Sequence, residues 1–200
     1  SNTIESFQLK DCLSHPSWFE PYEWLGKINK YTLHLISNQP THRLHGQLDN
    51  ASDSRKSKIK DREPVLINTS DANKRSIKDD DIVMLYNDRG KVLAGAILSE
   101  DVMPGVVVLS TGAWFDPNYN LNTEVHGNPN VLTNDVGTSS LGQGPTSHTT
   151  LIEIKKASKE EIADVMIFNI LSFKYFLLIS FLSFNDFKSK ELLNSFLCFS

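Results

Sequence analysis

Apolar residues in this chain gather in short runs of four to eight residues, separated by turn formers. Runs of this length that are rich in Val, Ile and Leu, with Gly, Pro, Asn or Asp at their ends, are typical of β-strands. They predict strands at residues 33–37, 65–68, 82–86, 91–98, 106–110 and 149–154. A short helix is predicted at 70–75, with Ser70 as its N-cap. The pattern therefore indicates a mainly β fold with short helices, and so many short strands favour a closed barrel.

The composition changes abruptly after about residue 154. All ten glycines lie at or before Gly144 and all eight prolines at or before Pro145, whereas eight of the eleven phenylalanines lie between residues 168 and 199. Turn signals therefore stop in the last part of the chain. We divide the chain into a lead-in segment (1–30), a barrel domain (31–154) and an atypical Phe/Leu/Ser-rich tail (155–200).

The tail has three interpretations, which the sequence leaves open. Its uncharged apolar run, Tyr175 to Phe184, is too short to cross a bilayer, so a membrane span is not expected. The tail is either a helix packed on the domain, a disordered segment, or the out-of-frame translation that follows a frameshift in an AT-rich gene.

Composition and charge exclude several function classes. The chain is 40% hydrophobic and 22% charged, as is typical of a globular protein, and its net charge of -4 gives no reason to expect nucleic acid as a partner. Cys12 and Cys198 form no metal-ligand pair and suggest no disulfide framework. The nearest approach to a basic patch is interpreted as a solvated surface; it contains Arg55, Lys56, Lys58, Lys60 and Arg62.

The chain begins Ser1-Asn2 without an initiator Met, which resembles the remnant of a cleaved tag. We therefore expect the first residue to be an artificial boundary. The compartment, periplasm or cytoplasm, stays open.

Three segments carry a likeness to a known family. They are His34-Leu35-Ile36-Ser37-Asn38-Gln39-Pro40 with Arg43-Leu44-His45-Gly46-Gln47-Leu48, then Leu109 to Asp116, then His126 to Thr133 with Gly137-Thr138-Ser139 and Gln143-Gly144-Pro145. Together they resemble the C-terminal domain of the dimethyl sulfoxide reductase family, above all its trimethylamine N-oxide and biotin sulfoxide reductases. The resemblance covers residues 8 to 154.

The resemblance implies that residues 31–154 form a double-psi β-barrel that binds molybdopterin guanine dinucleotide. In this family two such dinucleotides hold molybdenum, and the metal's own protein ligand lies in an earlier domain. The segment would then contribute cofactor contacts, but no catalytic residue and no metal ligand. Its expected partners are the cofactor and the remaining domains of a bacterial parent reductase. Whether the isolated domain binds the cofactor stays open.

The candidate cofactor-binding residues lie in polar loops at strand ends. A dinucleotide needs exposed backbone N–H groups and side-chain donors, and such loops supply both. From composition alone these segments would be surface turns, and only the resemblance favours a cofactor site. The candidates are Ser37, Asn38, Gln39, Arg43, His45, Gln47, Asn130, Gln143, Gly144 and His148.

Several candidates have chemistry suited to one part of the ligand. Arg43 can offer a planar fork to phosphate or to a guanine oxygen. Asn130 offers a paired donor and acceptor to a pterin edge, Gln143 can bond to ring nitrogens, and Gly144 allows close backbone approach. His45 is expected to be a neutral hydrogen-bonding residue, because no second His or Cys stands at metal-ligand spacing.

Two further features are assigned no direct role. Trp114-Phe115-Asp116 is interpreted as structural packing, because nothing in the sequence pairs with the carboxylate. Ser140 stands where members of the family usually carry Arg, and we expect reduced cofactor affinity or loop order from this exchange.

The leading functional hypothesis is that the parent enzyme reduces an S-oxide or N-oxide by two-electron oxygen-atom transfer at molybdenum. The cofactor performs that chemistry, so this segment alone would show no reductase activity. Two alternatives stay open: a stand-alone β-barrel module that binds a nucleotide or a protein, and a non-functional fragment of a frameshifted reductase gene. The substrate also stays open.

Overall fold

The structure is a computed structural model that describes residues 9–13, 15–27 and 29–166. The described residues up to Val165 belong to one compact unit. The three interpretations of the tail and the expectation for Cys198 therefore concern residues outside the described ones. The compact unit also includes residues that follow position 154, the last residue assigned to the barrel domain from the sequence.

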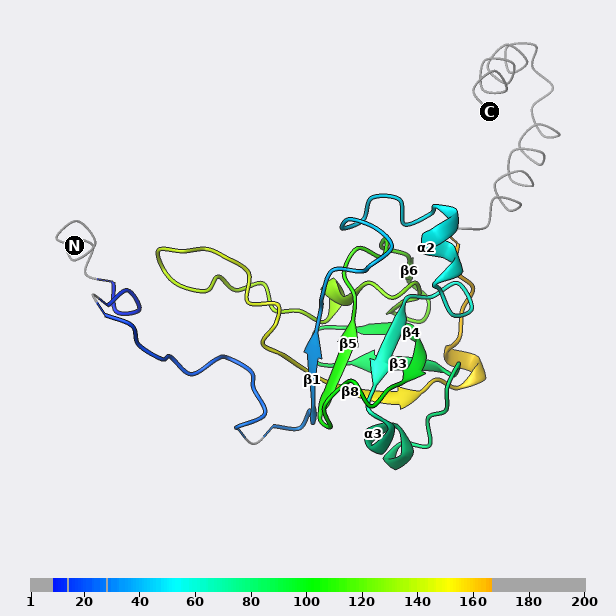
Figure 1. Cartoon of the computed structure of the whole chain (residues 1–200), viewed down its shortest axis with the longest axis horizontal. Coiled ribbons are helices and arrows are strands. Elements are labelled where there is room, and N and C mark those ends of the chain that lie inside the picture. Colours follow the sequence, from blue (N-terminus) through cyan, green and yellow to red (C-terminus); the bar gives the residue numbers. More distant parts are fainter. Residues whose placement is uncertain (1–8, 14, 28, 167–200) are drawn as a thin grey trace, which may run out of the picture. The chain divides into compact units, whose positions relative to one another are not determined.

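Six strands close into a barrel (Figure 1). They are β1 (Leu33–Ile36), β2 (Pro64–Ile67), β3 (Ile82–Tyr86), β4 (Lys91–Leu98), β5 (Val106–Leu109) and β8 (Thr150–Lys156). Their order is β2-β5-β1-β8-β3-β4, and a further pairing of β2 with β4 closes the ring. Two pairings, β1 with β5 and β2 with β4, are parallel. The predicted mainly β fold of the double-psi barrel class is confirmed.

Short elements connect the barrel strands. They are α2 (Ser52–Lys56), α3 (Thr69–Lys74), β6 (Pro117–Asn118), β7 (Thr123–Glu124), and the 3-10 turns η1 (Pro129–Val131) and η2 (Lys159–Glu161). β7 joins the barrel by pairing in parallel with β4. Figure 1 shows α3 and α2 at opposite ends of the barrel.

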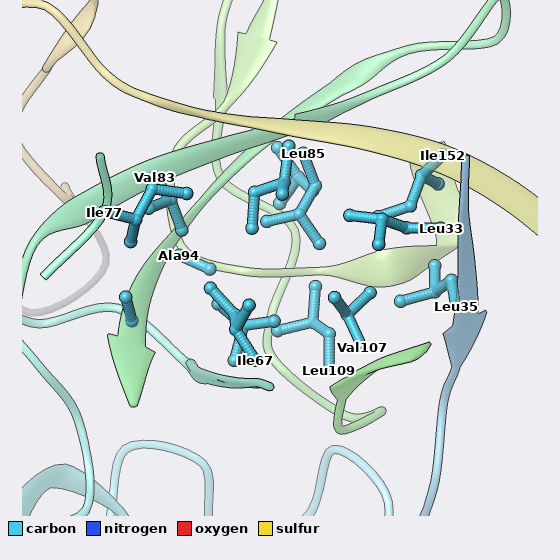
Figure 2. Close-up of a cluster of buried hydrophobic side chains, with 14 of the residues drawn as sticks. Leu33, Leu35, Ile67, Ile77, Val83, Leu85, Ala94, Val107, Leu109 and Ile152 are labelled. Atoms are coloured by element: carbon cyan, nitrogen blue, oxygen red, sulfur yellow. The ribbon is translucent and has the colours of Figure 1, made fainter. Parts of the chain in front are cut away.

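The core fills the inside of the barrel (Figure 2). Alternate residues of β1, β2 and β5 are buried, as expected for strands with one face inward. Figure 2 shows Leu33, Leu85 and Leu109, from three different strands, pointing into the same interior. Each fully buried side chain of this size contributes about 1.5–3 kcal/mol of hydrophobic free energy, so the apolar runs of the sequence determine the scaffold.

The prediction that Ser70 caps the short helix is wrong. α3 begins at Thr69, and Asn68 is its N-cap, with its side-chain oxygen accepting hydrogen bonds from the N–H of Ser70 (2.9 Å) and from its hydroxyl (2.7 Å). The Asn68 amide also donates to the Val102 carbonyl (2.7 Å). Asparagine is among the strongest N-cap residues, and here it also ties the helix to the strand connection that follows β4.

The interpretation of the basic cluster as a solvated surface is wrong for two of its members. The Lys58 side chain is only 1% exposed and pairs with Asp49 and Glu63. Arg62 is buried as well, and its guanidinium donates to the carbonyls of Lys60 and Ala163. Two buried carboxylates thus compensate Lys58, and backbone carbonyls accept from Arg62, and a charge pattern alone does not reveal such partners.

Candidate functional site

A pocket of about 500 Å³ opens where three loops meet. The first loop follows β1 and the second follows β5. Because β1 and β5 are parallel, their C-terminal ends lie at the same end of the barrel. The third loop follows β7 and continues into η1. The pocket is lined by Gln39, His45, Gly46, Thr111, Gly112, Ala113, Trp114, Phe115, Asn128 and Asn130.

The first two loops are joined at Asn38. Its carbonyl accepts a hydrogen bond from the Thr111 N–H (2.9 Å), and its side-chain oxygen accepts one from the Ser110 hydroxyl (2.8 Å). These contacts continue the register of the parallel strand pair beyond the last strand residues. The two loops therefore reach the pocket as one layer.

A clamp between Gln39 and His45 shapes the first loop. The Gln39 side-chain oxygen accepts from the His45 N–H (3.3 Å), and its amide nitrogen lies 3.1 Å from His45 Nδ1. With the amide in this orientation Nδ1 accepts, so the neutral imidazole carries its proton on Nε2. The clamp thus leaves an exposed ring donor on the wall of the pocket.

Gly112 packs directly against the first loop. Its backbone has a φ of 90°, in the left-handed region that favours glycine. A Cβ at this position would lie 2.0 Å from the His45 carbonyl oxygen. Only glycine lets these two backbone segments approach so closely.

Residues 111–115, which we call the pocket loop, are held from below by buried side chains. Arg43 donates to the Thr111 carbonyl (3.0 Å) and Asn128 to the Ala113 carbonyl (2.9 Å). Trp114 is held twice, since His126 Nδ1 donates to its carbonyl (3.0 Å) and its N–H donates to Asp49 (2.9 Å). The backbone of the pocket loop is therefore fixed by side chains from the two other loops, those that follow β1 and β7.

Four of the charges beneath the loop form what we call the ion cluster: Arg43, Asp49, Lys58 and Glu63. Lys58 lies 2.7 Å from Asp49 and 2.6 Å from Glu63, and Arg43 lies 3.0 Å from Glu63. Two cations thus balance two anions in a buried site. Burial alone would raise the pKa of Asp49, but the hydrogen bonds from Lys58 and from the Trp114 N–H outweigh it and lower that pKa. Asp49 is therefore ionised at neutral pH.

Glu124 organises the third loop. Its buried carboxylate accepts hydrogen bonds from four backbone N–H groups, those of Asp116 (3.1 Å), His126 (3.1 Å), Gly127 (2.8 Å) and Asn128 (2.7 Å). Burial raises the pKa of Glu124 to about 7, although the four N–H donors oppose this shift. The carboxylate joins the end of the second loop to the start of the third.

The structure brings three of the predicted site residues together on the pocket wall: Gln39, His45 and Asn130. Ser37 and Asn38 precede them at the end of β1, where Ser37 is buried, and Gln47 is an exposed neighbour of the pocket residue Gly46. That all of these residues contact the cofactor stays a prediction.

Arg43 occupies a different place from the one its predicted role requires. Its side chain is fully buried, and besides the ion cluster it contacts the Thr111 carbonyl and the Ser54 hydroxyl (3.1 Å). A direct contact with phosphate or guanine would require this network to open.

Gln143, Gly144 and His148 do not line the pocket. The Gln143 amide donates to the carbonyls of Ser139 (2.8 Å) and Ser140 (3.3 Å) within its own loop. Ser140, whose exchange for Arg was expected to weaken the loop, donates from its N–H (2.7 Å) and its hydroxyl (3.0 Å) to Asp11. The lead-in segment therefore anchors this loop.

The packing interpretation of Trp114 and Phe115 is wrong. Their side chains are 43% and 58% exposed and form an aromatic part of the pocket wall. The Trp114 indole donates to the Gly46 carbonyl (2.6 Å), which fixes its orientation. The third residue, Asp116, is buried as expected for a structural role. The likeness of residues 109–116 to the family was the signal that could have indicated a binding role.

Among the described residues, no group of three His, Cys, Asp or Glu side chains could hold a metal ion. Within the same part of the chain, no helix has the length and apolar character needed to cross a membrane. The pocket is thus lined by neutral hydrogen-bond donors and acceptors and by aromatic side chains. The ion cluster beneath it has equal numbers of positive and negative charges.

The family model described as "Molydopterin dinucleotide binding domain" matches residues 33–151. The chain belongs to this family. It is 46% identical over 155 residues to a biotin sulfoxide reductase of Cereibacter sphaeroides, and 44% identical over 161 residues to a trimethylamine-N-oxide reductase of Haemophilus influenzae. Each match covers 78% of this chain but only 21% and 20% of the relatives. The chain therefore spans about a fifth of the length of these relatives.

The fold has also been seen in a solved structure. Acetylene hydratase from Pelobacter acetylenicus matches 71% of this chain with a TM-score of 0.59, and the match covers 21% of that protein. At 12% sequence identity this likeness concerns the fold alone.

Proposed function

We propose that the pocket binds part of a molybdopterin guanine dinucleotide, and that the chain is the C-terminal portion of a molybdenum oxidoreductase that reduces an S-oxide or an N-oxide. The names of the two relatives support the reaction class. Family membership favours this role over a stand-alone module. The remaining domains of the parent enzyme, which are its expected partners, would supply the metal ligand and the substrate path.

The residues of the pocket fit such a ligand. A volume of about 500 Å³ lies within the usual range of small-molecule sites, which is about 300–1,000 Å³. Gln39 and Asn130 offer amide donors and acceptors, His45 offers a ring donor, and Trp114 and Phe115 offer aromatic surface to a planar ring. When bound, the molybdenum cofactor supplies the redox chemistry, and these residues would hold and orient it.

The single observation that carries this proposal is the meeting of Gln39, His45 and Asn130 in one pocket. They come from loops more than eighty residues apart in the sequence, and the sequence alone predicts all three as site residues. The other predicted residues take supporting roles in the proposal. Ser37, Asn38 and Gln47 shape the first loop. Gln143, Gly144 and His148 would contact the cofactor outside this pocket.

The test is a titration of the 200-residue chain with guanosine diphosphate, followed by amide NMR. We expect shifts at residues 37–47, 111–115 and 128–130, with a dissociation constant at or below about 1 mM, which corresponds to roughly 4 kcal/mol of binding free energy. An Asn130→Ala variant should bind more weakly, and an Asn73→Ala variant, changed at an exposed position of α3, should bind like the wild type. Shifts spread over the barrel without a cluster at the pocket would contradict the proposal.

A further inference from the structure

Two peptide groups of the pocket loop have their carbonyls directed into the protein. The Thr111 carbonyl accepts from Arg43 and the Trp114 carbonyl accepts from His126, and the side chains of both donors are fully buried. The described part of the chain contains no cis peptide bond. In a trans peptide, the carbonyl and the following N–H point in opposite directions.

The N–H groups of Gly112 and Phe115 therefore point away from the buried side of the loop. Both residues line the pocket. Within the described residues, neither N–H donates a hydrogen bond to a protein acceptor. Two backbone donors are thus available to a ligand on one face of one loop, an arrangement that binds anionic or carbonyl oxygens well.

We propose that Asp49 and Arg43 are positioning residues that hold the pocket loop so that the N–H groups of Gly112 and Phe115 bind an oxygen acceptor of the dinucleotide. This inference rests on the function proposed above. The acceptor belongs either to the diphosphate or to the guanine edge, since both carry suitable oxygens. Arg43 thus acts through the loop, and it does not itself touch the ligand.

Asp49 is the central member of this arrangement. One of its carboxylate oxygens accepts from the Trp114 N–H (2.9 Å), while the other accepts from Lys58 (2.7 Å) and from the Ser54 hydroxyl (3.3 Å). The same carboxylate therefore fixes the loop and neutralises a buried cation. A buried ion pair contributes little net stability compared with well-packed apolar residues, so its main contribution here is the geometry of the loop.

Two double variants separate these contributions. Asp49→Asn with Lys58→Met, and Asp49→Leu with Lys58→Met, each remove one carboxylate and one ammonium, which leaves Arg43 paired with Glu63. Asn and Leu have the same number and branching of side-chain heavy atoms, but only Asn keeps an oxygen that can accept from the Trp114 N–H. Lys58 is removed in both variants so that its ammonium does not compete with the Trp114 N–H for the single Asn oxygen.

Three measurements are made on the 200-residue chain and both variants. The first is the unfolding free energy, the second is the set of amide shifts of residues 111–115 without ligand, and the third is the affinity for guanosine diphosphate. We expect the Asn variant to keep the wild-type shifts and affinity. The Leu variant should move the Phe115 amide and bind about tenfold more weakly, the effect of one lost hydrogen bond. Separate titrations with inorganic pyrophosphate and with guanosine then show which of them moves the Gly112 and Phe115 amides.

Identical shifts and affinities in the two variants would overturn the inference. If the wild type itself does not bind guanosine diphosphate, the proposed function of the isolated chain fails. The positioning role is then still decided by the ligand-free shifts.

An Arg43→Lys variant covers the case in which a double variant does not fold. Its single nitrogen cannot reproduce the planar guanidinium, in which one nitrogen contacts both Glu63 and the Thr111 carbonyl while a second donates to the Ser54 hydroxyl. The variant should therefore change the amide chemical shift of Gly112 and leave that of Phe115 unchanged. An unchanged Gly112 amide shift would contradict the role assigned to Arg43.

Discussion

At the scale of single residues, Gly112 is the position where the site tolerates least change. A Gly112→Ala substitution would place a methyl group against the His45 carbonyl and force a left-handed backbone on alanine. Such a backbone costs about 1–2 kcal/mol, and the displaced first loop carries Gln39 and His45. We expect a lower melting temperature and at least about tenfold weaker binding of guanosine diphosphate, measured by thermal unfolding and by calorimetry.

Gly142→Ala is the matched control. The nearest atom to a Cβ at this exposed position is the Ser139 hydroxyl, at 3.3 Å, so a shift of a few tenths of an ångström makes room for the methyl group. This variant should resemble the wild type in both measurements. Wild-type binding by Gly112→Ala would show that the close contact between the two loops is dispensable.

The chemistry of the candidate site could be predicted from the sequence better than the geometry of the site could. Gln39, His45 and Asn130 were predicted as site residues because their segments resemble a family, whereas composition alone would have made them surface turns. Lys58 was misjudged, and the burial of Arg43 was not predicted, because a sequence does not reveal which charged side chain becomes enclosed. That outcome depends on Asp49 and Glu63, which reach the same interior only after the chain has folded.

At the scale of elements, the connection from β7 to η1 depends on the protonation of Glu124. Its pKa of about 7 in the folded chain lies above the ordinary value of 4.5. The folded state therefore binds more protons between these values, so the contribution of Glu124 to stability is present below pH 4.5 and is lost as pH rises to 7. The expected loss is on the order of 3 kcal/mol.

A Glu124→Gln variant, which has no titrating group at this position, isolates the effect. The difference in unfolding free energy between wild type and variant, measured by denaturant titration from pH 5 to 9, should fall as pH rises through 7 and level off about one pH unit above it. Burial lowers the pKa of His126, which gives an opposite slope, but this slope is common to both proteins and cancels. A constant difference would mean that the four N–H donors keep the carboxylate ionised throughout.

The main strands were predictable because each contains a run of apolar residues with turn formers at its ends. β6 and β7 contain two residues each and η1 three, so they contain no such run. The pocket itself could not be derived from these patterns. It forms because β1 and β5 pair in parallel although they are separated by seventy residues, and local sequence patterns do not specify strand pairing over such a distance.

At the scale of the whole molecule, the proposed function makes the chain a cofactor-binding surface that the rest of a parent enzyme would complete. The matched segment makes up only 21% and 20% of the two relatives, and the pocket wall carries exposed aromatic side chains such as Phe115. Surfaces of this kind are normally covered by a ligand or a neighbouring domain. We therefore expect the complete parent protein to show the effect of the pocket on cofactor occupancy more strongly than the isolated chain does.

The corresponding prediction concerns molybdenum content. Asn130→Ala in the complete parent protein removes a donor and an acceptor from the pocket wall, and a site that loses one or two hydrogen bonds binds roughly tenfold or more weakly. Purified protein should therefore contain less molybdenum and less guanine nucleotide per chain, measured by metal analysis and by nucleotide release. Asn73→Ala, at an exposed position of α3 outside the pocket, controls for handling and expression. Full cofactor occupancy in the Asn130 variant would show that this side chain is not part of the cofactor site. Loss of cofactor in both variants would indicate a general defect in cofactor loading.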